Sequence, residues 1–76
     1  MERGPIMRVL SELKGSEQSL LLALQGRETP VELRHVEEAV ELHSANGIRI
    51  TTAENDIWID ASHVSAIWHQ RGDEHP

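Results

Sequence analysis

Apolar residues near the start of the chain recur at the spacing of a helix. They fall at positions i, i+3, i+4 and i+7, along one side of a helix: Ile6, Val9, Leu10 and Leu13. Pro5 suits the first helical turn, where its missing N–H needs no partner, and Gly15 suits a left-handed residue beyond the end. The pattern predicts an amphipathic helix over about residues 5–14, too short to be stable unless it docks on the rest of the chain.

From residue 19 onward apolar positions alternate with polar ones, which is typical of strands with one buried face. Placing apolar side chains opposite one another predicts three antiparallel pairings. The predicted cross-strand partners are Leu24 and Val31, Leu22 and Leu33, Leu42 and Ile50, Ser44 and Ile48, Ile50 and Ile59, Arg49 and Asp60, and Thr51 and Trp58. The predicted loops are Gly26–Thr29 and Ala45–Gly47, with Gly47 in the left-handed conformation.

The end of the predicted core is a bend at Ala61–His63 and a short strand at Ser65–Trp68. A polar tail follows over residues 70–76. Together these elements predict an all-β protein, a small and strongly bent antiparallel sheet or barrel over about residues 19–69 with a short N-terminal helix.

A second interpretation places a helix at about residues 30–45, which makes the fold α+β. Residues 29–32, Thr-Pro-Val-Glu, fit a capping box, and Gly47 is placed to end such a helix. Ser62 is likewise placed to begin a final helix. The frequent β-branched residues favour strands in both regions.

Length and charge narrow the classes of protein. The chain has 76 residues, no cysteine and a formal net charge of -6. This length predicts a single domain over residues 1–76 with a small core, and the missing cysteines exclude disulfides and thiolate metal sites. No apolar run has the length of a membrane span or the form of a signal peptide, so we expect a cytoplasmic protein. The acidic balance argues against general binding of polyanions.

The stretch Ile57-Trp58-Ile59-Asp60-Ala61-Ser62-His63-Val64-Ser65-Ala66-Ile67 resembles the closing strand, bend and strand of Sm-like and SH3-like barrels. The layout over about residues 5–69 is also similar to the Rof family of Rho-inhibiting proteins. That resemblance implies a protein that binds the transcription terminator and blocks its access to RNA. The Asp and Asn/Gly signatures with which Sm proteins contact RNA are not identifiable here, so no functional residue is carried over.

The five histidines stand singly, at positions 35, 43, 63, 69 and 75. They form none of the spacings that bind metal, and we expect no metal and no cofactor. His35 falls on the apolar side of its predicted strand, where a packed, hydrogen-bonded histidine is expected. The serines lie in no nucleophile motif, and no glycine-rich phosphate loop is present. The sequence therefore predicts a protein that is not an enzyme.

Trp58 is the most informative single residue, because it alternates with Ile57 and Ile59 and so points away from their face. Tryptophan on an outer face is either covered by another segment or used for binding. A group of glutamates offers an acidic patch for a basic partner surface, or simply a solvated face. The candidate partner-binding residues are Trp58, Thr51, Arg49, Asp60, Glu32, Glu37, Glu38 and Glu41.

These observations predict a non-catalytic protein-interaction module that acts through an acidic face and an exposed tryptophan. A protein partner and a homo-oligomer are expected, and a membrane is not. The alternative is an Sm-like barrel that binds RNA or single-stranded nucleic acid, which requires basic and aromatic residues side by side. Arg49 and Trp58 are the residues that would serve this purpose.

Overall fold

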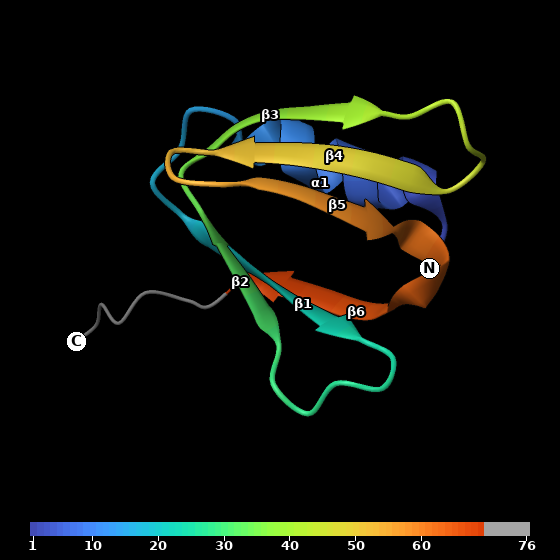
Figure 1. Cartoon of the computed structure of the whole chain (residues 1–76). Coiled ribbons are helices and arrows are strands. Elements are labelled where there is room, and N and C mark those ends of the chain that lie inside the picture. Colours follow the sequence, from blue (N-terminus) through green and yellow to red (C-terminus); the bar gives the residue numbers. More distant parts are fainter. Residues whose placement is uncertain (70–76) are drawn as a thin grey trace.

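Residues 1–69 fold into one helix followed by six short strands (Figure 1). The computed structural model describes residues 1–69, so the predicted tail over residues 70–76 lies outside the described residues. The elements are α1 (Arg3–Leu13), β1 (Ser19–Leu24), β2 (Val31–Arg34), β3 (Val36–Glu41), β4 (Gly47–Thr52), β5 (Asp56–Asp60), the 3-10 turn η1 (Ala61–His63) and β6 (Val64–His69).

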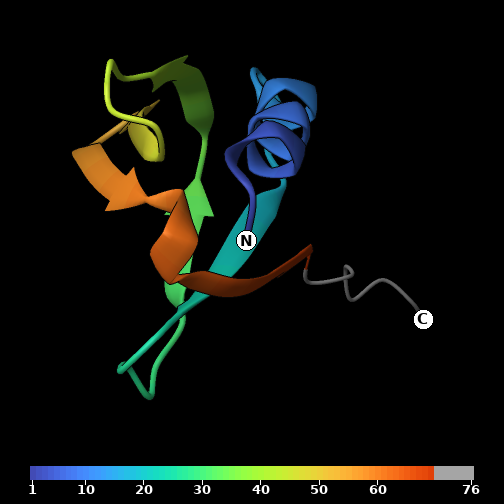
Figure 2. The same ribbon diagram turned by 90° about the vertical axis from the view of Figure 1, so that its right-hand side faces the viewer.

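The strands form two antiparallel sheets of three strands each. Sheet A has the order β2-β1-β6, and sheet B has the order β3-β4-β5. The chain passes from sheet A into sheet B at His35 and returns to sheet A through η1 (Figures 1 and 2). Within residues 1–69, β5 and β6 do not pair with each other. The mostly β prediction is confirmed in this form, whereas the predicted barrel is not closed.

The core lies between the inner faces of the two sheets and α1. Figure 2 shows the helix on the inner side of sheet B. The fully covered residues come from every layer: Ile6, Leu10, Leu13, Leu20, Leu22, Leu33, Val36, Ile48, Ile50, Ala61 and Val64. The predicted docked helix is confirmed, and Gly15 takes the expected left-handed conformation with φ at +79°. The opposite side of each sheet is its outer face.

The alternative helix over residues 30–45 is wrong, because this stretch forms β2 and β3. Strands here satisfy the backbone groups of β1 and β4 as well as their own. The alternative final helix after Ser62 is wrong for the same reason, since β6 pairs with β1.

Two of the predicted pairings are shifted by two residues. Leu22, not Leu24, lies opposite Val31. The reason is that the end of β1 turns toward η1, where the backbone N–H of Gln25 donates to the backbone carbonyl of His63. Ile50 lies opposite Ile57 rather than Ile59.

The second shift arises at the turn between β4 and β5. The backbone N–H of Asn55 donates to the Thr52 hydroxyl, and the backbone N–H of Thr52 donates to the Asn55 backbone carbonyl. This arrangement leaves only Ala53 and Glu54 between the paired residues Thr52 and Asn55. A shift by two residues keeps the same side chains on the same face, so the predicted faces survive.

The pairing of β3 with β4 is shifted by three residues, which reverses the faces of β3. Ile50 lies opposite Ala39 instead of Leu42. Gly47 is not left-handed but forms part of β4, and the Ser44 hydroxyl accepts its amide at 3.0 Å. As a consequence Val40 is on the outer face, 39% exposed.

His35 also departs from its prediction. It is exposed rather than packed, with φ at 57°. A left-handed residue interrupts the alternation of a strand, so the apolar position that the pattern assigned to His35 does not exist. This residue is the corner at which the chain leaves sheet A and enters sheet B.

Candidate interaction face on sheet B

Three side chains form a row across the outer face of sheet B. Arg49, on the central strand β4, lies opposite Val40 of β3 and Trp58 of β5. Trp58 is 62% exposed, the largest exposure among the large apolar residues of the described chain. Residues opposite one another in a sheet have Cβ atoms about 4.5–5.5 Å apart, so the three side chains adjoin. We call Val40, Arg49 and Trp58 the tryptophan row.

Arg49 carries the only positive charge in this row. Two ion pairs form within residues 1–69, Arg3–Glu41 and Arg34–Glu32, and Arg49 belongs to neither of them. Its Nε atom is buried and has no hydrogen-bond partner among the described residues. A guanidinium over the face of an indole is attracted by the ring, and the position of Trp58 directly opposite Arg49 puts the two side chains within reach of such a contact.

Polar residues border the tryptophan row on one side. Thr51 follows Arg49 on β4 and lies opposite Asp56 on β5 and Glu38 on β3. The Thr51 hydroxyl donates to Asp56 Oδ1 at 2.9 Å. The face therefore has an apolar and cationic row beside a row that carries two carboxylates.

Asp60 is on the same face but has another role. It was expected opposite Arg49; it lies opposite Gly47 and caps η1 instead. Its Oδ1 atom accepts the Ser62 amide at 2.9 Å and the Ser62 hydroxyl at 2.6 Å. These two hydrogen bonds to the charged form hold the pKa of Asp60 below its ordinary value.

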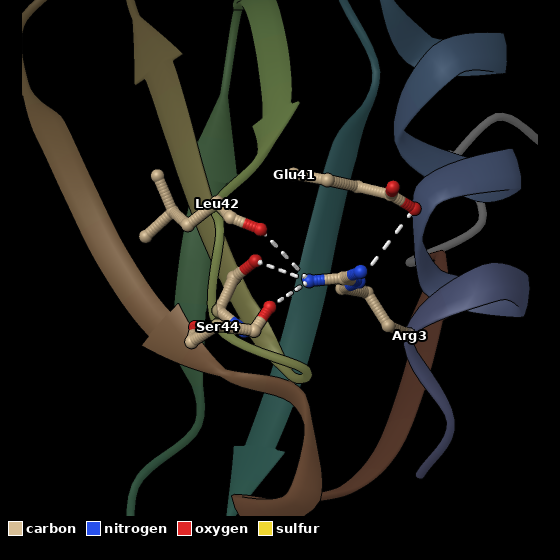
Figure 3. A network of polar contacts seen from close by, with 5 residues as sticks. Arg3, Glu41, Leu42 and Ser44 are labelled. Atoms are coloured by element: carbon tan, nitrogen blue, oxygen red, sulfur yellow. Dashed lines mark hydrogen bonds and ion pairs between the residues drawn. The ribbon is translucent and has the colours of Figure 1, made fainter.

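The glutamates of the predicted acidic patch do not gather on one surface. Glu38 lies on the outer face of sheet B, next to Thr51. Glu41 was expected on the polar side of β3, but the reversed faces turn it toward α1, where its carboxylate lies 3.6 Å from Arg3 Nε (Figure 3).

The other two glutamates lie farther from the tryptophan row. Glu32 is on the outer face of sheet A, opposite Leu21, and accepts a hydrogen bond from Arg34 at 3.0 Å. This bond lowers the pKa of Glu32, with a smaller contribution from Ser19. Glu37 is the extra residue where the register of β3 shifts, and it borders a hollow beside Gly15. The acidic patch is thus divided among several surfaces.

A concavity of about 270 Å³ lies where β2 meets the turn between β4 and β5. Its lining includes His35, Glu54 and Asn55, as well as the Glu32–Arg34 ion pair. In that pair the Glu32 carboxylate accepts a hydrogen bond from Arg34 Nε at 3.0 Å. Residues 1–69 hold no cluster of three or more His, Asp or Glu that could bind a metal.

No protein-family model matches this chain, and neither a curated protein nor a solved structure matches it. The resemblance to Sm-like barrels and to the Rof family stays a prediction. In the described part of the chain, no helix has the length and apolar character needed to span a membrane.

Val40 is the member of the tryptophan row that the sequence pattern missed. The pattern placed it on the inner face, because the expected pairing of Leu42 with Ile50 put even-numbered residues of this strand inside. The signal that was available is local: Glu37 and Glu38 are adjacent charges in a strand, and two adjacent polar residues indicate a bulge that changes the alternation.

Proposed function

We propose that this chain is a non-catalytic protein-interaction module and that the tryptophan row is the centre of its contact face. The observation that carries the proposal is the exposure of Trp58 beside Val40 on one sheet face. Tryptophan and arginine are the residues most enriched where binding energy concentrates. A partner that covers this row removes apolar surface from water, which is favourable.

The charges of the face indicate the chemistry of the partner. Opposite Arg49, at the centre of the contact, we expect the partner to place a hydrogen-bond acceptor such as a carboxylate, surrounded by apolar side chains. Opposite Glu38 and Asp56, at one border of the contact face, we expect the partner to carry basic groups. The net charge of -6 on the whole chain speeds encounter with a basic surface.

The test uses the full chain as bait in extracts of its native cells, followed by affinity measurement with each purified partner. Trp58→Ala weakens binding about 30-fold, or ~2 kcal/mol, as expected for a residue at the centre of an interface. Arg49→Ala weakens the same partner. Matched controls are Trp68→Ala, which removes an exposed tryptophan of sheet A, and Arg27→Ala in an exposed loop.

A partner whose affinity is unchanged by Trp58→Ala, with the variant still folded by circular dichroism, would contradict the proposal. The same holds if Trp58→Ala unfolds the domain, because Trp58 then belongs to the core.

Binding of single-stranded nucleic acid is the second candidate, supported by Arg49 directly opposite Trp58. A base can stack on the indole while the guanidinium meets a phosphate. The neighbouring carboxylates of Glu38 and Asp56 oppose a polyanion. Fluorescence anisotropy with labelled oligonucleotides decides: an affinity that falls with salt and requires both residues supports this candidate, and no binding at low salt removes it.

A further inference from the structure

The outer face of sheet A forms a second surface with an apolar centre. Leu21, on the central strand β1, lies opposite Trp68 on one side and Glu32 on the other. Trp68 is 40% exposed. The pairing pattern places seven residues on this face: Ser19, Leu21, Ala23, Glu32, Arg34, Ala66 and Trp68.

Within residues 1–69, this face carries no net charge, although the molecule is acidic. Its charged residues, Glu32 and Arg34, have opposite signs and form an ion pair. By contrast, the outer face of sheet B sets three carboxylates against the single charge of Arg49. Two copies of a chain with a net charge of -6 repel each other at most approaches. The neutral face is the place where they meet without that cost.

We infer that the outer face of sheet A binds a second copy of this chain in a twofold dimer, sheet packed on sheet. In such a dimer the same surface serves both copies. A twofold axis that crosses the strands between Glu32 and Arg34 sets each carboxylate opposite the guanidinium of the other copy. The face is therefore complementary to itself in charge. This inference does not depend on the proposed role of the tryptophan row.

The area of the outer face of sheet A determines how tightly two copies are expected to bind. Three strands spaced about 4.8 Å apart and roughly 17–20 Å long make a small patch. At about 300 Å² per copy it is smaller than the roughly 800 Å² per partner of a standard interface, so we expect a weak dimer with a dissociation constant of roughly 0.1–1 mM.

The first test is sedimentation equilibrium of the full chain over this concentration range. The expected result is a monomer–dimer equilibrium that Leu21→Glu and Trp68→Ala each weaken at least about tenfold. Leu21 is on the central strand, so its substitution alters no sheet edge. Arg27→Ala, in an exposed loop outside both sheets, is the control and leaves the dimer unchanged. A monomer at every concentration overturns the inference, and so does a dimer indifferent to Leu21→Glu and Trp68→Ala.

The second test exploits the charge pair and does not depend on apolar substitutions. Glu32→Arg and Arg34→Glu, each alone, place like charges opposite one another and abolish self-association. Mixing the two variants restores association, because each then meets opposite charges on the other. Native mass spectrometry identifies the mixed species. Recovery of a mixed dimer supports the inference, and its absence while both variants remain folded contradicts the proposed pairing.

Discussion

Arg49 has apolar neighbours across the sheet on both sides, Val40 and Trp58. An isolated charge in such a position loses part of its hydration, and the described residues do not replace it with an ion pair. A binding partner that supplies an acceptor relieves this deficit. The chemistry of the candidate face therefore depends on one residue whose position follows from cross-strand register rather than from any local motif.

Asp60 provides a test at the level of a single carboxylate. Its pKa is lowered below the ordinary 3.8 by the hydrogen bonds from Ser62. A group whose pKa is lower in the folded state stabilises the fold above its unfolded pKa, and this stabilisation is lost as the pH falls through the folded pKa. We expect the free energy of unfolding of the wild type to decline below about pH 4 in part through Asp60.

Urea denaturation between pH 2 and pH 7 checks this prediction. Asp60→Ala is less stable at pH 7 and loses less stability on acidification than the wild type. Asp60→Asn is the matched control, since an asparagine still caps η1 but does not titrate. An acid dependence in Asp60→Asn equal to that of the wild type would show that the Asp60 carboxyl contributes nothing.

At the scale of elements, alternation of apolar residues predicted which strands exist but not how they align. Leu22 and Ile50 keep their predicted faces despite a shift of two residues, because the period of a strand is two. The predicted β3–β4 pairing is wrong because the strand bulges between Val36 and Glu38, and the loop that follows β3 contacts Arg3, which is 39 residues away from Leu42 and lies in another element. No local pattern encodes that contact.

Arg3 connects the start of α1 to the loop between β3 and β4 through hydrogen bonds. Its Nη1 atom donates to the carbonyls of Leu42, Ser44 and Gly47 at 3.2, 2.6 and 3.3 Å (Figure 3). Hydrogen bonds from a charged donor contribute more than neutral ones. We expect Arg3→Ala to lower the free energy of unfolding by about 1–3 kcal/mol and to speed amide exchange at Leu42.

Arg8→Ala is the control for Arg3→Ala, because Arg8 is an exposed arginine on the same helix. It changes the net charge equally, and it leaves stability within about 0.5 kcal/mol of the wild type. Chemical denaturation and hydrogen exchange measure both variants. Equal losses for the two substitutions would mean that charge, and not the loop contacts, accounts for the effect.

The whole molecule has one core shared by two sheets. Leu22 and Leu33 enter it from sheet A, Ile48 and Ile50 from sheet B, and Leu10 from the helix. Neither sheet buries its inner face without the other. The domain is therefore expected to unfold in a single step, as small domains with one core usually do.

The two tryptophans allow this to be measured, since Trp58 is on sheet B and Trp68 is on sheet A. In Trp68→Phe and Trp58→Phe, fluorescence reports on one sheet at a time. We expect a single urea midpoint for each protein. Adding Ile48→Val, a change in sheet B that costs about 0.5–1.5 kcal/mol, shifts the transition recorded by Trp68 as much as that recorded by Trp58. Different shifts at the two probes would indicate sheets that unfold separately.

The corner at His35 has a consequence for how this chain tolerates changes of length. Because only His35, a left-handed residue, separates β2 from β3, the alternation changes phase at this corner, and Leu33 and Val36 are both buried although they are three positions apart. A single inserted residue here would turn one sheet inside out and exchange buried for solvated side chains. Insertions of any length are better accommodated in the exposed stretch around Arg27 and Glu28, which carries no such phase relation and is the natural place to graft a label or an epitope.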